Sequence, residues 1–136
     1  MVKLILGSKG HGKTKKLIEL VNAAATNTKG FVVCVDKSGK LGINISNTVR
    51  LSATDEYDVY GYAAFYGFLA GICAGNYDIT DVFVDATLRI GTRDMDKLSA
   101  FLDAIEKLSR FSETDFTFTV SEDKENLPDS VLKYCA

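Results

Sequence analysis

Residues 7–14 carry the groups that proteins use to bind phosphate. The run reads GSKGHGKT, with three glycines, two lysines and a threonine in eight positions. Glycines allow a loop to turn its backbone N–H groups inward, toward an anion. The ammonium of Lys13 suits the β- and γ-phosphates of a nucleotide, and the hydroxyl of Thr14 suits Mg²⁺. We therefore predict a phosphate-binding loop made of Gly7, Ser8, Lys9, Gly10, His11, Gly12, Lys13 and Thr14.

The segments on either side of this loop are suited to holding it. Residues 2–6 form a short apolar run, which predicts a buried strand. After the loop, Leu17, Ile18 and Val21 fall on one face of a helix, which we expect over residues 13–25. Turn-forming residues and Gly30 then end that helix. A loop that leads into a helix gains the partial positive charge of the helix N-terminus, so this setting favours phosphate binding.

The pattern GxxxxGKT between a strand and a helix resembles the Walker A motif of P-loop NTPases. The resemblance implies nucleotide binding by residues 7–14 and a catalytic role for Lys13. It also implies Mg²⁺ bound together with ATP, with Thr14 as a ligand of the ion. Residues 1–36 are in addition similar to bacterial-type thymidine kinases, although the DE pair and the cysteine zinc ribbon of those enzymes are missing.

A second apolar run ends in an acid that is the best match to a Walker B motif. Val82, Phe83 and Val84 precede Asp85, which lies 71 positions after Thr14. P-loop proteins place such an aspartate at the end of a buried strand to hold the Mg²⁺ shell. We therefore predict Asp85 as a metal-site residue, with a strand-end or helix-capping acid as the alternative.

Asp36 is the second candidate for that acid, because it ends the apolar run 31–35. Ala86 stands where many P-loop ATPases carry a glutamate that activates water, so we expect slow intrinsic hydrolysis. Arg89 and Arg93 follow on a glycine-containing segment. We predict them as catalytic groups that reach the transferred phosphate within the same chain, with ordinary surface arginines as the alternative.

Other residues near the predicted site carry weaker signals. His11 is the one histidine of the chain, and we expect it to face solvent, with phosphate binding or pH sensing as the alternative. Ser121 follows the last predicted strand, at the edge where α/β sheets bind ligands. The NKxD motif of GTPases is absent, and the DxxG match at residues 58–61 opens a helix rather than ending a strand.

Residues 59–75 form a stretch of seventeen residues without a charge, in which Gly67, Gly71 and Gly75 recur every four positions. The stretch is shorter than the roughly 20 residues that span a membrane. We predict a buried helix whose glycines let it lie close against the sheet. Nearby tyrosines offer an alternative, a protein-partner or homo-oligomer face. They are Tyr57, Tyr60, Tyr62 and Tyr66.

The remaining pattern predicts an α/β fold. Strands are expected at residues 31–35, 48–51, 81–85 and 116–120, with helices at 94–111 and from 128 onward. Residues 37–47 are expected to be mostly a loop that carries a short hairpin. Together these elements give a small, doubly wound, mostly parallel sheet of about five strands with helices on both faces. We expect residues 1–136 to form one domain.

Composition narrows the class of protein further. The net charge is −2 and the basic residues are scattered, so the footprint of a nucleic-acid binder is missing. Three widely separated cysteines, without a CxxC pair, suit reduced thiols and a cytoplasmic location. The apolar start is too short for a signal peptide.

Three functions fit these patterns. The first is an ATP-binding protein that hydrolyses slowly with Mg²⁺. The second is a nucleotide-sensing interaction module without significant catalysis. The third is a small-molecule kinase, which would use Asp36, Asp85, Arg89 and Arg93 as its base and cationic groups.

Overall fold

The computed structural model describes residues 1–8, 10 and 12–135. Five parallel strands form one sheet in the order β1-β5-β4-β2-β3. The strands are β1 (Val2–Leu6), β2 (Phe31–Asp36), β3 (Arg50–Ala53), β4 (Ile79–Asp85) and β5 (Asp115–Val120). The α-helices are α1 (Lys13–Asn27), α2 (Gly61–Gly75), α3 (Thr87–Ile90), α4 (Met95–Ser112) and α5 (Asp129–Leu132). Short 3-10 helices are η1 (Lys40–Asn44), η2 (Thr54–Tyr57) and η3 (Lys124–Asn126).

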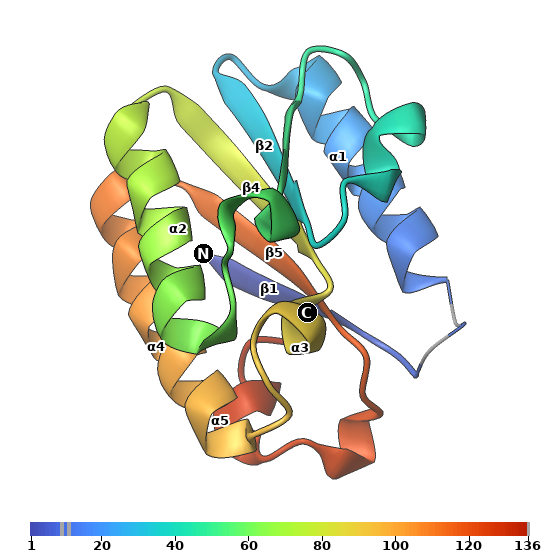
Figure 1. Cartoon of the computed structure of the whole chain (residues 1–136), viewed down its shortest axis with the longest axis vertical. Coiled ribbons are helices and arrows are strands. Elements are labelled where there is room, and N and C mark those ends of the chain that lie inside the picture. The colour runs from blue at the N-terminus through green and yellow to red at the C-terminus, as the bar shows by residue number, and fades with distance from the viewer. Residues whose placement is uncertain (9, 11, 136) are drawn as a thin grey trace.

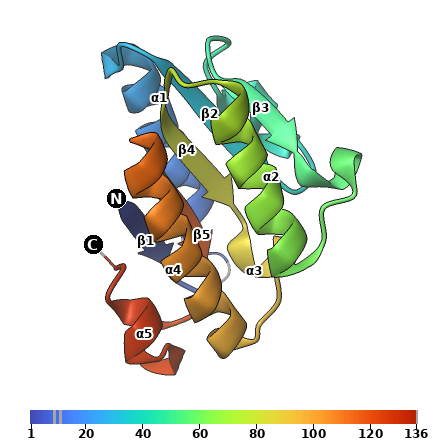
Figure 2. The same ribbon diagram turned by 90° about the vertical axis from the view of Figure 1, so that its left-hand side faces the viewer.

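Helices cover both faces of the sheet, which confirms the predicted doubly wound α/β fold (Figure 1). Helix α1 lies on one face, where Leu17 and Val21 pack against Cys34 and Phe83. Helices α2 and α4 lie side by side on the other face (Figure 2). Strands covered on both sides must be apolar on both sides, and this is why the sequence shows continuous apolar runs there.

Helix α2 packs on the sheet as predicted, but not through its glycines. The buried residues of α2 are Phe65, Leu69 and Cys73. A Cβ atom built on Gly67, Gly71 or Gly75 would meet nothing within 4 Å. The prediction that these glycines bring the helix close to the sheet is therefore wrong. The large apolar side chains occupy the inward face, and the glycines face outward.

Residues 37–47 contain no hairpin, contrary to the prediction. Instead, η1 begins after Gly39, whose φ of 82° is a backbone conformation that favours glycine. Its buried residue Leu41 packs in the cluster beneath α1. The strand expected at 48–51 begins two residues later, because the Val49 N–H closes a turn onto Ser46.

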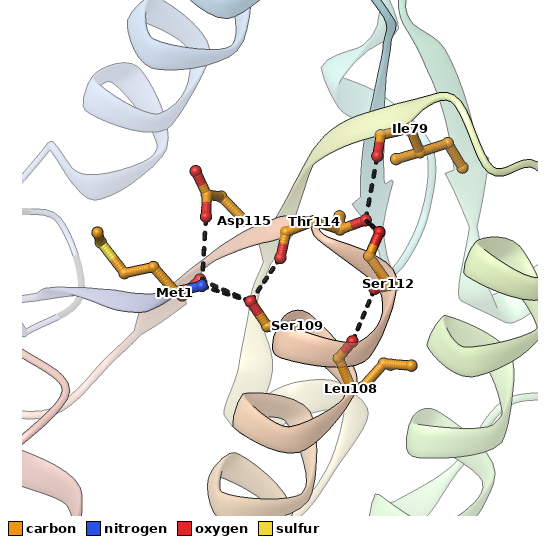
Figure 3. Close-up of polar contacts among 7 residues, drawn as sticks. All are labelled: Met1, Ile79, Leu108, Ser109, Ser112, Thr114 and Asp115. Carbon is orange, nitrogen blue, oxygen red and sulfur yellow. Dashed lines mark hydrogen bonds and ion pairs between the residues drawn. The ribbon is translucent and has the colours of Figure 1, made fainter.

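A polar network ties together elements at the amino edge of the sheet, opposite the predicted loop (Figure 3). The buried Thr114 hydroxyl donates a hydrogen bond to the Ile79 carbonyl at 3.0 Å, and its own carbonyl accepts one from Ser109. The Met1 amino group contacts Ser109 and lies 3.2 Å from an Asp115 oxygen. These contacts join the end of α4 to the residue that precedes β1 and to the first residues of β4 and β5.

Among the described residues, no helix combines the length and the apolar character that crossing a membrane requires.

Candidate functional site

Gly7 and Ser8 follow β1 at the carboxyl end of the sheet, and Gly12 directly precedes α1. Gly10 has a φ of 89° and Gly12 a φ of 77°, both in the left-handed region where side chains are strained. This geometry explains the glycines of the predicted loop, since a Cβ at either position would be disfavoured by the backbone itself. Lys9 and His11, which were also predicted to belong to the loop, lie outside the described residues.

Lys13 is the first residue of α1, and its side chain turns back toward the loop. The residue is only 8% exposed. Its ammonium donates a hydrogen bond to the Ser8 carbonyl at 3.0 Å. A cation is thereby held beside the loop backbone and the N-terminus of α1, and both of these favour an anion.

The structure brings Thr14 and Asp85 together. The Thr14 hydroxyl donates a hydrogen bond to Asp85 Oδ2 at 3.2 Å. The two side chains come from different elements, the first turn of α1 and the last residue of β4. Hydroxyl and carboxylate oxygens are ligands that Mg²⁺ prefers, so this pair has the chemistry of the predicted metal site.

Sequence reasoning missed a third member of this group. The hydroxyl of Thr119, a fully buried residue of β5, donates a hydrogen bond to Asp85 Oδ1. Thr14 and Thr119 thus hold the two oxygens of one carboxylate and fix its orientation. The available signal was the alternation of Phe and Thr at residues 116–119, which puts Thr119 near a strand end. It did not indicate which strand lies next to β5.

Asp36, the second candidate acid, lies beside Asp85 in the sheet. The two residues are register partners on β2 and β4, so their side chains leave the sheet on the same face. Asp36 is only 7% exposed, and its Oδ2 accepts a hydrogen bond from the Leu41 N–H at 3.4 Å. The structure therefore gives Asp85, rather than Asp36, the contact with Thr14.

The thiol of Cys34 is buried close to the two carboxylates of Asp36 and Asp85, at the carboxyl end of the sheet. Burial raises the pKa of Cys34 to about 12, and the charges of Asp36 and Asp85 contribute in the same direction. Two carboxylates within reach of a buried thiol create a negative potential, which a cation would relieve. No group of three or more His, Cys, Asp or Glu side chains that could hold a metal occurs in the part of the chain that the structure describes.

Arg89 and Arg93 lie at a pocket of about 270 Å³ next to the loop. The Arg93 guanidinium forms an ion pair with Glu122 at 3.2 Å. Ser121 lines the same pocket, as its position after β5 suggested. We call this the Arg89 pocket, and the lining residues that matter below are Ser8, Ala86, Arg89, Arg93, Ser121 and Glu122.

A separate pocket of about 440 Å³ lies between α1 and β1, away from this group, and includes Met1, Leu20 and Asn27.

The four tyrosines considered as a protein-partner or homo-oligomer face differ in their exposure. Tyr57 and Tyr60 are 54% and 61% exposed. Tyr62 packs against the core, and its hydroxyl donates a hydrogen bond to the Thr92 carbonyl at 2.6 Å. Tyr66 also packs against the core. Burial raises the pKa of Tyr62 to about 12.

Comparison with known proteins adds no family to this geometry, since no protein-family model matches the chain and neither does any curated protein.

Proposed function

We propose that this chain is a P-loop protein that binds Mg·ATP and hydrolyses it slowly. The observation that carries the proposal is the contact between the Thr14 hydroxyl and Asp85, formed where the glycine loop meets α1. A metal-ligand pair, a buried lysine and a helix N-terminus then lie around one loop. Each of these features is suited to a different part of a magnesium-bound triphosphate.

Each residue has a distinct part in this proposal. The loop N–H groups and the Lys13 ammonium bind the phosphates, while Thr14 and, through water, Asp85 hold the ion. Thr119 keeps the Asp85 carboxylate oriented. When bound, Mg²⁺ neutralises charge that develops on the phosphate oxygens.

Slow turnover is proposed because neither the position after Asp85 nor the nearby Glu122 offers a free carboxylate to activate water. Ala86 has no acidic group, and the carboxylate of Glu122 is already engaged by other residues. Its oxygens accept hydrogen bonds from Asn126 at 2.9 Å, from the Asp123 N–H at 3.1 Å and from Arg93 at 3.2 Å. The hydrogen bond from Asn126, followed by that from Asp123, lowers the pKa of Glu122, which weakens it further as a base.

The same observation supports a second candidate, a nucleotide-sensing module that turns over only with a partner. Phosphate release by the purified chain, measured with and without cell extract, separates the two. Turnover that appears only with extract and disappears in a Lys13→Ala variant would favour the sensing module.

Binding is tested by thermal shift with ATP, ADP, GTP and dATP, each in Mg²⁺ or in EDTA. We expect Lys13→Ala to weaken ATP binding at least about tenfold, roughly 1.4 kcal/mol. Lys15→Ala is the matched control, because Lys15 is an exposed lysine in the same helical turn. Unchanged ATP affinity in a folded Lys13→Ala protein would rule the proposal out.

A further inference from the structure

The Arg89 pocket lies where three segments from the carboxyl end of the sheet meet. Ser8 follows β1, Ala86 and Arg89 follow β4, and Ser121 follows β5. Ser8 is also the residue whose carbonyl accepts the hydrogen bond from Lys13. The pocket therefore adjoins the loop of the proposed nucleotide site, on which the present inference rests.

The charges that line this pocket do not cancel. Glu122 and Arg93 form an ion pair, so their opposite charges balance. Arg89 is an exposed residue of α3, and none of the ion pairs formed by the described residues includes it. One guanidinium charge is left over. A guanidinium offers several donors in a fixed plane, which suits the oxygens of phosphate or carboxylate.

The size of the pocket limits what can enter. Its volume of about 270 Å³ is below the roughly 300–1,000 Å³ of sites for drug-sized ligands. It is also several times the approximately 30 Å³ that one water molecule occupies in the liquid. Ser8 and Ser121 are polar residues of the lining. A small polar anion fits these limits, whereas a second nucleotide does not.

We propose that the Arg89 pocket binds a small oxyanion beside the nucleotide, with Arg89 as the residue that neutralises its charge. The shared chemistry is a phosphate-like group. It belongs either to the phosphate released from ATP or to a small phosphorylated second substrate. Arg93 acts in this arrangement as a wall of the pocket that Glu122 holds in place.

The test is a calorimetric titration of potassium phosphate into protein saturated with Mg·ADP, at constant ionic strength set with potassium chloride. We expect phosphate to bind without displacing ADP. Arg89→Ala should weaken phosphate at least tenfold, and Arg89→Lys should recover part of the loss, because the charge remains. Arg110→Ala is the control, since Arg110 is an exposed arginine in the last turn of α4, outside the pocket.

A parallel titration of glycerol 3-phosphate into Mg·ATP-loaded protein separates the two sources. Binding of both anions with the same dependence on Arg89 identifies a second-substrate pocket. Binding of inorganic phosphate alone identifies a site for the released product. Wild-type affinity for both anions in Arg89→Ala, or phosphate that displaces ADP, would overturn the proposal.

Failure of the proposed nucleotide function gives a different result. Mg·ADP would then not bind, and phosphate is titrated into the nucleotide-free protein instead. An Arg89-dependent phosphate affinity in that experiment would still support the pocket, and affinity that does not depend on Arg89 would refute it.

Discussion

The Thr14 hydroxyl lies 3.2 Å from the Asp85 carboxylate, although the two residues are 71 positions apart in the chain. Such a contact requires that α1 start directly over the end of β4. It places a helix-borne hydroxyl and a strand-borne carboxylate at the same point, as a shared magnesium shell would need.

The effect of Mg²⁺ on stabilisation by ATP should depend on Thr14 and Asp85. We expect Thr14→Ala and Asp85→Asn each to reduce the thermal stabilisation that Mg·ATP gives over ATP in EDTA. The first change removes the hydroxyl proposed to bind the ion, and the second removes the negative charge proposed to hold it through water. The measurement is a melting curve with both ligand forms. Full retention of the Mg²⁺ effect in Asp85→Asn would assign the metal role to another acid, and Asp36 is the neighbour in register.

Thr119→Val should weaken the same Mg²⁺ effect without unfolding the protein. The substitution keeps the side-chain shape but removes the hydrogen bond to Asp85 Oδ1, and we expect about 1 kcal/mol of lost stability. Thr117→Val is the matched control, since Thr117 lies two residues earlier on the same face of β5. Equal effects of the two changes on Mg·ATP stabilisation would contradict an orienting role for Thr119.

Turnover by the isolated chain should be below about one per minute. P-loop GTPases without a supplied catalytic group run near 10⁻⁴ to 10⁻³ per second. If the leftover charge of Arg89 acts on the transferred phosphate, Arg89→Ala should lose most of this turnover and keep ATP binding. Arg93→Ala should have the smaller effect, because Arg93 is paired with Glu122. Single-turnover assays measure both. Many turnovers per second, unaffected by both changes, would point to a water-activating group elsewhere.

Stability should fall at alkaline pH because of Cys34. Its pKa is raised from 9.0 to about 12 in the folded protein, chiefly by burial. The folded state therefore keeps the proton more tightly, and this contribution is complete below pH 9 and is lost as the pH rises toward 12. Linkage gives a loss of about 1.4 kcal/mol between pH 8 and pH 10. Urea unfolding of wild type and Cys34→Ala at both values tests this, and an equal pH slope in the two proteins would contradict it.

Outward-facing glycines make α2 a candidate for stabilisation. Gly67→Ala and Gly71→Ala should each raise the free energy of unfolding by about 0.5–1 kcal/mol, because the methyl group meets no atom within 4 Å and the unfolded chain loses freedom. Gly91→Ala should do the opposite, since its Cβ would lie 2.2 Å from the Tyr62 ring. Chemical denaturation measures all three, and destabilisation by Gly67→Ala would show that this face is covered.

The sequence was sufficient to predict the fold class and the order of most elements. Apolar runs such as 31–35 must be strands covered on two sides, and the stripe of Leu98, Leu102 and Ile105 must be a helix. The orientation of α2 could not be predicted, because its residues are apolar or small on every side. Periodicity then carries no information about which side faces the sheet.

The contact between Thr14 and Asp85 lay within reach of sequence reasoning, because a loop lysine and a strand-end acid occur in a recognisable order. The contact between Thr119 and Asp85 could not be predicted from the sequence. It depends on β5 pairing with β4, and a parallel sheet can place a late strand at several positions. The Arg93–Glu122 ion pair likewise joins two loops that no local pattern connects.

The position of β5 has a consequence for folding during synthesis on the ribosome. This strand is the last to be synthesised, yet it lies between β1, which leads into the loop, and β4, which ends in Asp85. A ribosome-bound chain that ends before Asp115 holds every loop residue but lacks the strand that hydrogen-bonds to both β1 and β4, so the strand that leads into the loop is not joined to the sheet. Nucleotide should therefore be unable to assist the early stages of folding on the ribosome. ATP should not change the folding of a nascent chain arrested before β5. It should promote the folding of a chain arrested after β5, once β5 is free of the ribosome.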